Sequence, residues 1–389
     1  MSILTQIGTG GIKDNAVTTP KLNDAAVTTP KIDDGDVTTA KLADSAVTLS
    51  KTSGIETPKN ILINGNMSVW QRATSKTGFT NDDHATVDRY RTTIDSLGTW
   101  AQTQSTDVPS GAGTGFPYSL KMDCTTADAS PAAADRIYFE QRLEGNAVQH
   151  LKKGTADAVS VTLSFWVKSS KTGTYIIRIQ DNDNTRSICK SYTINSANTW
   201  EKKELTFGAD STGTLDNDNQ FSLGVQWWLG AGSDYTSGTL QTSWDADTNA
   251  NLAVGQVNLG DSTSNEWYLT GCQLEVGTVA NNFAFESYDE TFQKCQRYCQ
   301  KITRFQFYFY HFWDGNNVKG DTVGVYTSPL RATPGTFNVV NASRANSVLV
   351  QMNRFSGSYH LRNFYNTPNG WSQFVSDSYV NNIVLEAEI

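Results

Sequence analysis

The sequence predicts a mainly β protein, an elongated fibre with an N-terminal repeat stem, an antiparallel β-sandwich, one connecting helix and a small C-terminal β domain. Three observations support this prediction. Of 389 residues, 11% are aromatic and only 18% are charged, a balance typical of many short strands joined by polar turns. Apolar and polar residues alternate through the middle of the chain, which indicates strands. Near the N-terminus a ten-residue unit recurs, which indicates a repeat architecture.

The charge and hydropathy of the chain argue against two kinds of partner. There are 31 Lys and Arg against 39 Asp and Glu, with no long run of either sign, so no basic face for nucleic acid is expected. No apolar run approaches the ~20 residues of a membrane helix, so no membrane insertion is expected. The segment Met1–Gln6 has neither the basic start nor the apolar core of a secretory signal. We therefore expect the product to accumulate in the cytoplasm of the cell that makes it.

The cysteines are odd in number and widely spaced. Such a distribution fits reduced thiols better than a disulfide framework. The five are Cys124, Cys189, Cys272, Cys295 and Cys299.

The repeat lies in residues 12–54. Its four copies read AVTTPKLND, AVTTPKIDD, DVTTAKLAD and AVTLSKTSG, each followed or preceded by one small or acidic residue. An apolar side chain recurs every five residues, a spacing that suits neither a continuous strand nor a continuous helix. A short extended piece followed by one helical turn, with Pro20 or Pro30 at the first helical position, brings these side chains to one side. The expected stripe is Val17, Leu22, Val27, Ile32, Val37, Leu42 and Val47.

A single copy of the chain cannot stabilise this stripe. Ordering each residue costs ~1–2 kcal/mol, and two apolar side chains per ten residues bury too little surface to offset that cost. Several copies wound about a common axis would bury the stripe, so the repeat predicts a homo-oligomer. The alternative is a disordered linker, but a linker has no reason to keep Val and Leu in register.

These tandem decapeptides resemble the stems of tail fibre proteins from tailed bacteriophages, particularly short-tailed marine ones. The resemblance implies a homotrimer with residues 12–54 as its stem and residues 1–11 as a virion attachment segment. It also implies other virion tail proteins as partners at the N-terminus. The expected location is the virion, as a tail appendage assembled in the host cytoplasm.

After a hinge at residues 55–60, residues 61–285 carry strand signals without intervening helical patterns. Many short strands of this kind indicate an antiparallel sandwich of two sheets. The expected strands are centred on Tyr118–Met122, Ile137–Phe139, Val159–Val167, Tyr175–Ile179, Leu205–Phe207, Phe221–Leu229 and Trp267–Val276.

This region resembles the jelly-roll carbohydrate-binding modules that phage fibres also carry, which implies a jelly-roll fold and sugar binding. The matching stretches are Asn60 to Arg72, Asp88-Arg89-Tyr90, Phe165 to Lys168, Thr199 to Lys203 and Tyr268 to Val276.

Sugar binding needs aromatic faces for the apolar side of a pyranose and planar polar groups for its hydroxyls. Trp228, Tyr235 and Trp244 lie in a turn-rich stretch with Asn and Asp nearby. Trp227 falls on the core face of its strand, so Trp228 is expected to be the exposed ring. The alternative is that these aromatics fill the sandwich or pack against a neighbouring subunit.

Two acidic turns offer oxygen ligands that suit calcium. They are residues 181–184 and residues 216–219, both Asp-Asn-Asp-Asn. Neither has the spacing and glycine of an EF-hand loop, and each also reads as a polar hairpin turn. No other cofactor is expected.

Residues 286–301 predict the connecting helix. Phe292, Cys295, Tyr298 and Cys299 fall on one face at spacings of three and four. The two cysteines lack the further ligands of a metal site, so we expect them to be small buried apolar residues.

Residues 302–389 predict a β domain at the tip of the fibre. Its aromatic residues include Trp313, Tyr359 and Trp371, which lie near loops rich in Asn and Gly. Such a surface suits recognition of a bacterial surface polymer, and it equally suits an aromatic trimer interface.

The sequence has no Gly-rich phosphate loop, zinc motif or nucleophile elbow, so no enzyme activity is expected. Carboxylate pairs such as Glu140/Glu144 and Glu286/Asp289 are the remaining candidates for a glycan-cleaving site. The leading interpretation is a fibre that binds host surface polysaccharide. The alternatives are a purely structural virion fibre, including a head fibre or an appendage that links an adaptor, and a polysaccharide-degrading spike.

Overall fold

The computed structural model describes residues 60–307 except residues 82 and 112, together with six strand segments between residues 312 and 386. Side chains are described from Asn60 to Lys301. The stem with its expected apolar stripe, from Val17 to Val47, lies outside the described residues.

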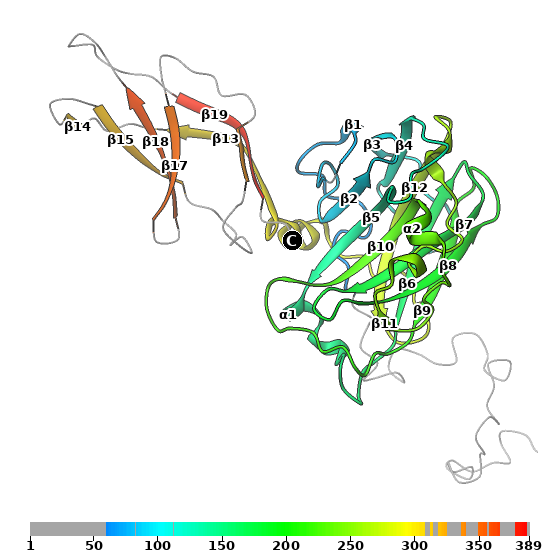
Figure 1. Cartoon of the computed structure of the whole chain (residues 1–389). Helices are drawn as coiled ribbons and strands as arrows, with labels where there is room; N and C mark the ends of the chain where they lie inside the picture. Colours follow the sequence, from blue (N-terminus) through cyan, green and yellow to red (C-terminus); the bar gives the residue numbers. More distant parts are fainter. Residues whose placement is uncertain are drawn as a thin grey trace, which may run out of the picture. The chain divides into compact units, whose positions relative to one another are not determined.

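Two six-stranded antiparallel sheets form the central sandwich (Figure 1), which confirms the predicted fold class. The first sheet has the order β1 (Ser75–Phe79), β3 (Thr99–Ser105), β4 (Ser119–Thr126), β12 (Glu266–Val276), β6 (Val161–Ser169) and β9 (Glu201–Phe207). The second has the order β11 (Asp245–Ala246), β8 (Arg186–Ile194), β7 (Gly173–Asp181), β10 (Phe221–Ala231), β5 (Arg136–Glu144) and β2 (Tyr90–Asp95). Several neighbours are distant in sequence, such as β4 and β12 in the first sheet and β5 and β10 in the second, as a jelly roll requires.

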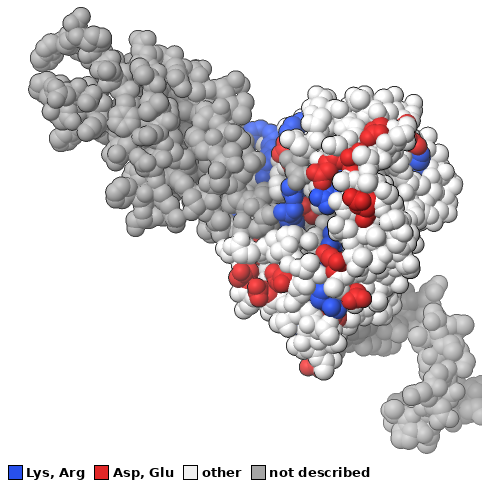
Figure 2. All heavy atoms as spheres, in the orientation of Figure 1, with Lys and Arg blue, Asp and Glu red and all other residues white. Residues whose placement is uncertain are grey.

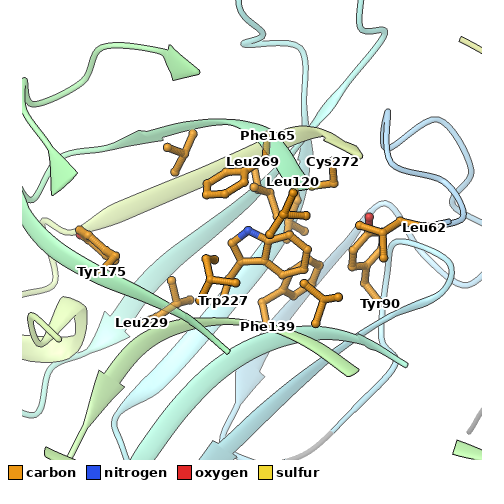
Figure 3. Packing of buried hydrophobic residues seen from close by; sticks show 14 of the residues in the cluster. Leu62, Tyr90, Leu120, Phe139, Phe165, Tyr175, Trp227, Leu229, Leu269 and Cys272 are labelled. Carbon is orange, nitrogen blue, oxygen red and sulfur yellow. The ribbon is translucent and has the colours of Figure 1, made fainter. Parts of the chain in front are cut away.

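Alternate residues of the strands fill the space between the two sheets. Leu223, Val225, Trp227 and Leu229 of β10 all face this core, as their spacing of two predicts. Figure 3 shows the Trp227 ring between the two layers of strands, with Phe139 and Phe165 nearby. Burial of this large aromatic set is the main source of stability for the sandwich.

Two strands that the sequence pattern did not indicate, β2 and β3, carry polar residues at core positions. Thr92 of β2 and Gln102 of β3 are both buried. Gln102 Nε2 donates a hydrogen bond to Thr92 Oγ1 at 3.1 Å and so links the two sheets. A hydrogen bond in the interior satisfies both polar side chains. Because these core positions are polar, the strands lack the apolar alternation by which a strand is recognised in a sequence.

The predicted connecting helix is α3 (Tyr288–Gln296). Ser287 caps it, since the Glu290 N–H donates to Ser287 Oγ and the Glu290 carboxylate accepts from the Ser287 N–H. The helix ends earlier than predicted, and Cys299 opens the strand β13 (Cys299–Phe307). Among the described residues no helix is long and apolar enough to cross a membrane.

All five cysteines are buried and none forms a disulfide, as predicted. Burial raises the pKa of the Cys124 thiol to about 11 and that of Cys189 to about 12, because the thiolate loses its hydration.

The chain enters and leaves the sandwich through hydrogen-bonded segments. Asn60 Oδ1 accepts from the Leu274 N–H at 3.0 Å. Gln71 Nε2 donates to the Cys299 carbonyl at 2.8 Å, and the Lys301 N–H donates to Gln71 Oε1 at 3.3 Å. Asp88, which is fully buried, accepts from the Gln71 N–H at 2.9 Å. Gln71 therefore ties the start of the sandwich to the start of β13.

Strands continue beyond residue 302, as predicted for the C-terminal part. One three-stranded sheet has the order β13, β19 (Ser378–Glu386) and β16 (Thr336–Val339). A four-stranded sheet has the order β14 (Phe312–Trp313), β15 (Val318–Gly324), β18 (Ser358–Tyr365) and β17 (Leu349–Phe355).

Candidate functional site

A polar hollow of about 330 Å³ lies beside the short helix α1 (Gly145–Val148) and the 3-10 turn η5 (Gln149–Leu151). Its wall combines ammonium, carboxylate, hydroxyl and amide groups with two apolar side chains. The lining residues are Val148, Gln149, Lys152, Lys153, Thr155, Asp157, Thr214 and Leu215.

The two acidic turns that the sequence singled out meet beside this hollow. The Asp216 N–H donates to Asp183 Oδ2 at 2.9 Å, and Asn184 Nδ2 donates to the Thr214 carbonyl at 2.7 Å. Gln149 Nε2 donates to the carbonyls of Gly145 and Asp216, each at 3.0 Å. These bonds fix the rim of the hollow through backbone groups and leave its lining side chains on a stable frame.

A buried ion network lies behind the wall. Lys153 Nζ is 2.6 Å from Asp181 Oδ2 and 2.8 Å from Asp210 Oδ2, and the side chains of all three are at most 5% exposed. Arg186 Nε adds a contact of 3.1 Å to Asp210. Burial acts to raise the pKa of Asp210, but hydrogen bonds from Lys153, Thr212 and Arg186 outweigh it and hold that pKa well below its ordinary value.

The residues of the acidic turns do not fit a calcium site. Asp181 already binds the Lys153 ammonium, and Asp183 accepts a backbone N–H. Calcium needs six to eight oxygen ligands around one point, whereas a cationic nitrogen lies between the two buried carboxylates here. Within the described residues no three His, Cys, Asp or Glu side chains are grouped to hold a metal ion.

Trp244 is the predicted aromatic candidate that lies beside this hollow. Lys153 Nζ lies 4.1 Å from the centre of the Trp244 ring, within the range of a cation–π contact. Its Nε1–H donates to the Gly208 carbonyl at 2.7 Å. The half-buried ring packs against the core, so it supports the position of Lys153.

The prediction that Trp228 is exposed is wrong. Its ring does leave the core face of β10, but it is only 1% exposed. The segment 232–258 covers the outer face of this sheet, where the short helix α2 (Ser233–Thr236) packs on β10 (Figure 1). Tyr235 of that helix is also buried, with its ring centre 5.5 Å from that of Trp228. A second apolar cluster forms there from Tyr138, Ile176, Cys189, Trp228, Tyr235, Leu252 and Ala253.

The remaining aromatic candidates belong to the C-terminal part. Trp313 lies in β14 and Tyr359 lies in β18, whose side chains are outside the described set. Trp371 lies outside the described residues. The structure therefore brings Trp228 and Tyr235 together in the interior and places Trp244 alone beside the hollow.

The first pair of carboxylates considered for glycan cleavage, Glu140 and Glu144, is engaged by cations. Glu140 is 2.9 Å from Arg142 and 3.2 Å from Arg91, and it is fully buried. Arg297 contacts Glu144 through two nitrogens, at 2.7 and 3.0 Å. Burial acts to raise the pKa of Glu144, but hydrogen bonds from Arg297 and Tyr298 outweigh it and lower that pKa. A general acid needs a raised pKa, so Glu144 is unsuited to that role.

The face of the sandwich in view in Figure 2 carries no field of one sign. Figure 2 shows Lys and Arg interspersed with Asp and Glu on the face in view, and most of that face is uncharged. Mixed charge of this kind does not select a strongly anionic or cationic ligand. Sequence reasoning missed Lys152, Thr155 and Asp157, because a polar turn between two strands looks the same whether or not it lines a hollow.

No family model matches the sequence, and no curated protein matches it. Solved structures match with low identity. The enzymatically active domain of bacteriophage CBA120 tailspike protein 4 is 13% identical with a TM-score of 0.30, over 56% of this chain and 21% of that one. A family 11 carbohydrate-binding module of a Clostridium thermocellum cellulosomal cellulase is 12% identical with a TM-score of 0.26, over 52% and 96%. A family 22 xylan-binding domain is 14% identical with a TM-score of 0.26, over 52% and 98%.

Proposed function

We propose that this chain is a subunit of a homotrimeric bacteriophage tail fibre that attaches to the virion by its N-terminus and binds a host cell-surface glycan through its globular domains. The observation that carries the proposal is the joining of four decapeptide repeats to a jelly-roll sandwich with a polar hollow at its edge. The repeats need several copies of the chain, and the hollow offers the polar groups that a sugar needs.

The chemistry of the hollow suits a glycan of low net charge. Exposed Lys152 brings donors and exposed Asp157 brings an acceptor, while Thr155 Oγ1 already donates to the Lys152 carbonyl at 2.7 Å and the apolar side chains of Val148 and Leu215 are almost fully buried. The deeper Lys153 is balanced by Asp181 and Asp210, so the charges that a ligand meets are those of exposed Lys152 and Asp157, one of each sign. Binding without cleavage is inferred, because Glu140 and Glu144 are held by guanidinium groups.

A binding experiment tests the glycan part. The full chain is titrated by calorimetry with capsular and lipopolysaccharide O-chain polysaccharides of candidate host bacteria. The double variant Lys152→Ala/Asp157→Ala removes two polar contacts and should weaken binding by about tenfold or more, since each contact contributes ~1 kcal/mol. The matched control Lys202→Ala/Glu204→Ala removes an exposed ion pair on β9 and should bind like the native chain.

The outcomes separate the alternatives. Equal binding by the two double variants moves the site out of the hollow, and absence of binding to every polysaccharide favours a purely structural virion fibre. Release of reducing ends during incubation identifies a polysaccharide-degrading spike.

The assembly part is tested separately by sedimentation of the full chain. A mass of three chains is expected, and removal of residues 1–57 should reduce it. A monomeric full chain overturns the trimeric fibre.

A further inference from the structure

Exposed apolar side chains are concentrated in one short segment. Among residues 60–301 the large apolar side chains that are well exposed are Val276 at 44%, Val279 at 71%, Phe285 at 49% and Tyr288 at 56%. All four fall within thirteen consecutive residues, at the end of β12 and the start of α3. Exposed apolar residues scattered singly need no explanation, whereas such a gathering marks an interaction surface.

The aromatic members form two groups of packed rings, the first of them resting on buried Phe116. The ring centre of Phe285 is 4.9 Å from that of Phe283 and 5.4 Å from that of Phe116. Tyr288 stacks on Phe292 with ring centres 5.7 Å apart. We call these five residues, Phe116, Phe283, Phe285, Tyr288 and Phe292, the aromatic ridge.

The backbone beneath the ridge is fixed by hydrogen bonds. The Ala284 N–H donates to Gln273 Oε1 at 2.7 Å, and the Asn281 N–H donates to Glu275 Oε1 at 2.9 Å. Both acceptors belong to the central strand β12, and the Ser287 cap fixes the start of α3. The exposed rings therefore stand on a preorganised frame, which lowers the entropy cost of binding a partner.

Two acidic groups beside the ridge have partners within the chain. Glu286 pairs with Lys294, and the Glu290 carboxylate accepts from the Ser287 N–H and hydroxyl. Covering this surface would leave few charges without a partner, and such burial is what makes an apolar interface favourable.

The ridge also lies where the chain arrives from the repeats. Asn60 Nδ2 donates to the Cys272 carbonyl at 2.8 Å, and Asn60 shares a small hollow with Phe283, Ala284 and Glu286. Gly54, the last residue of the repeats, is six residues from Asn60, so at most ~20 Å of extended chain separates them. The ridge therefore belongs to the part of the sandwich that is nearest the repeats along the chain.

We propose that the aromatic ridge is a second interface between copies of this chain, where the sandwiches of the homotrimer contact one another. This inference rests on the proposed trimeric fibre. The ridge supplies aromatic and aliphatic contact area, which is typical of stable homomeric interfaces, and its small hollow of about 10 Å³ offers no room for a small molecule.

Site-directed cross-linking of the full chain tests the proposal. All five native cysteines are buried, so a thiol placed by Phe285→Cys reports on its own surroundings. A short bis-maleimide should join most chains in pairs. The matched control Ser237→Cys places an exposed thiol at the end of α2 and should leave chains uncrosslinked.

A second variant measures the contribution of the ridge to assembly. Val279→Ser/Phe285→Ser changes two exposed side chains, so the fold should persist by circular dichroism while the trimer dissociates at a lower urea concentration than the native one. A trimer that gives no excess of cross-linked Phe285→Cys over the control, with unchanged urea dissociation, overturns the ridge interface and leaves the trimeric fibre standing. A monomeric native chain instead overturns the fibre itself. Protection of the Phe285→Cys thiol without cross-linking assigns the ridge to a segment of the same chain and also overturns the interface.

Discussion

The polar hollow and the aromatic ridge differ in whether their side chains have partners within the chain. Behind the hollow, every charge of the Lys153 network has a partner in the same chain at hydrogen-bond distance. On the ridge, Phe285 and Tyr288 remain about half exposed on a rigid frame. A surface whose charges are already paired suits a ligand that binds reversibly, whereas a surface with exposed apolar side chains is stabilised by a permanent interface.

The largest expected effect is a loss of stability when the ion network behind the hollow is disrupted. Lys153→Met removes the ammonium between Asp181 and Asp210 and leaves two buried carboxylates with one remaining cation, Arg186. The free energy of unfolding should fall by about 3–5 kcal/mol, measured by urea denaturation. Lys152→Met, at the exposed neighbour, should change it by less than about 0.5 kcal/mol. Similar values for the two variants would show that the network is not a structural element.

The next effect separates the two tryptophans once expected to bind sugar. Trp228→Ala empties a buried site in the second apolar cluster and should lower stability by about 3–5 kcal/mol. Trp244→Ala removes a half-buried ring and should cost about 1–2 kcal/mol. The same urea titration measures both, and a larger loss for Trp244 would contradict the burial that we describe.

A smaller effect concerns acid. The pKa of Asp210 is lower in the folded chain than in the unfolded one, so the unfolded state takes up a proton first as the pH falls. The stability contributed by Asp210 is present above its unfolded pKa of about 3.9 and is lost progressively below it. The free energy of unfolding should show this decline when it is measured from about pH 6 to about pH 2, on both sides of that pKa. It should be shallower in Asp210→Asn and unchanged in Asp157→Asn, which alters an exposed carboxylate.

The smallest effect concerns the buried native thiols, which we expect not to react with a thiol reagent. Burial raises the pKa of the thiols of Cys124 and Cys189, so neither should react with a thiol reagent at pH 8 until the chain is unfolded. The variant Val279→Cys places a thiol at the most exposed apolar residue of its segment. In monomeric chains this thiol should react rapidly. Rapid labelling of the native cysteines would show that the sandwich opens.

Much of the fold follows from local pattern. The strands around Phe165, Ile177 and Val225 have apolar residues at every second position, and each forms where it was expected. The sequence pattern does not predict β2 and β3, because Thr92 and Gln102 occupy core positions, where their side chains are hydrogen-bonded to each other. Polar pairs of this kind are invisible until the two strands are placed together.

The site was harder to predict than the fold, for a physical reason. Strand periodicity correctly turns Trp228 away from the main core, but it carries no information on residues 232–258 that cover the outer face. The hollow gathers residues from Val148 to Leu215, so only tertiary contacts reveal it. Asp181 and Asp183 read as oxygen ligands in sequence, whereas their partners, Lys153 and the Asp216 N–H, come from distant parts of the chain.

The hydrogen bonds of Gln71 give the sandwich a mechanical property. A fibre under tension would be pulled through the point where its chain enters, at Asn60, and the point where it leaves, at Cys299. Gln71 joins the entering segment directly to the Cys299 carbonyl and the Lys301 N–H. Part of a pulling force would therefore pass through Gln71, while the bonds of Asn60 to Leu274 and Cys272 would carry the rest into β12. In single-molecule pulling, Gln71→Ala should lower the force at which the sandwich first extends.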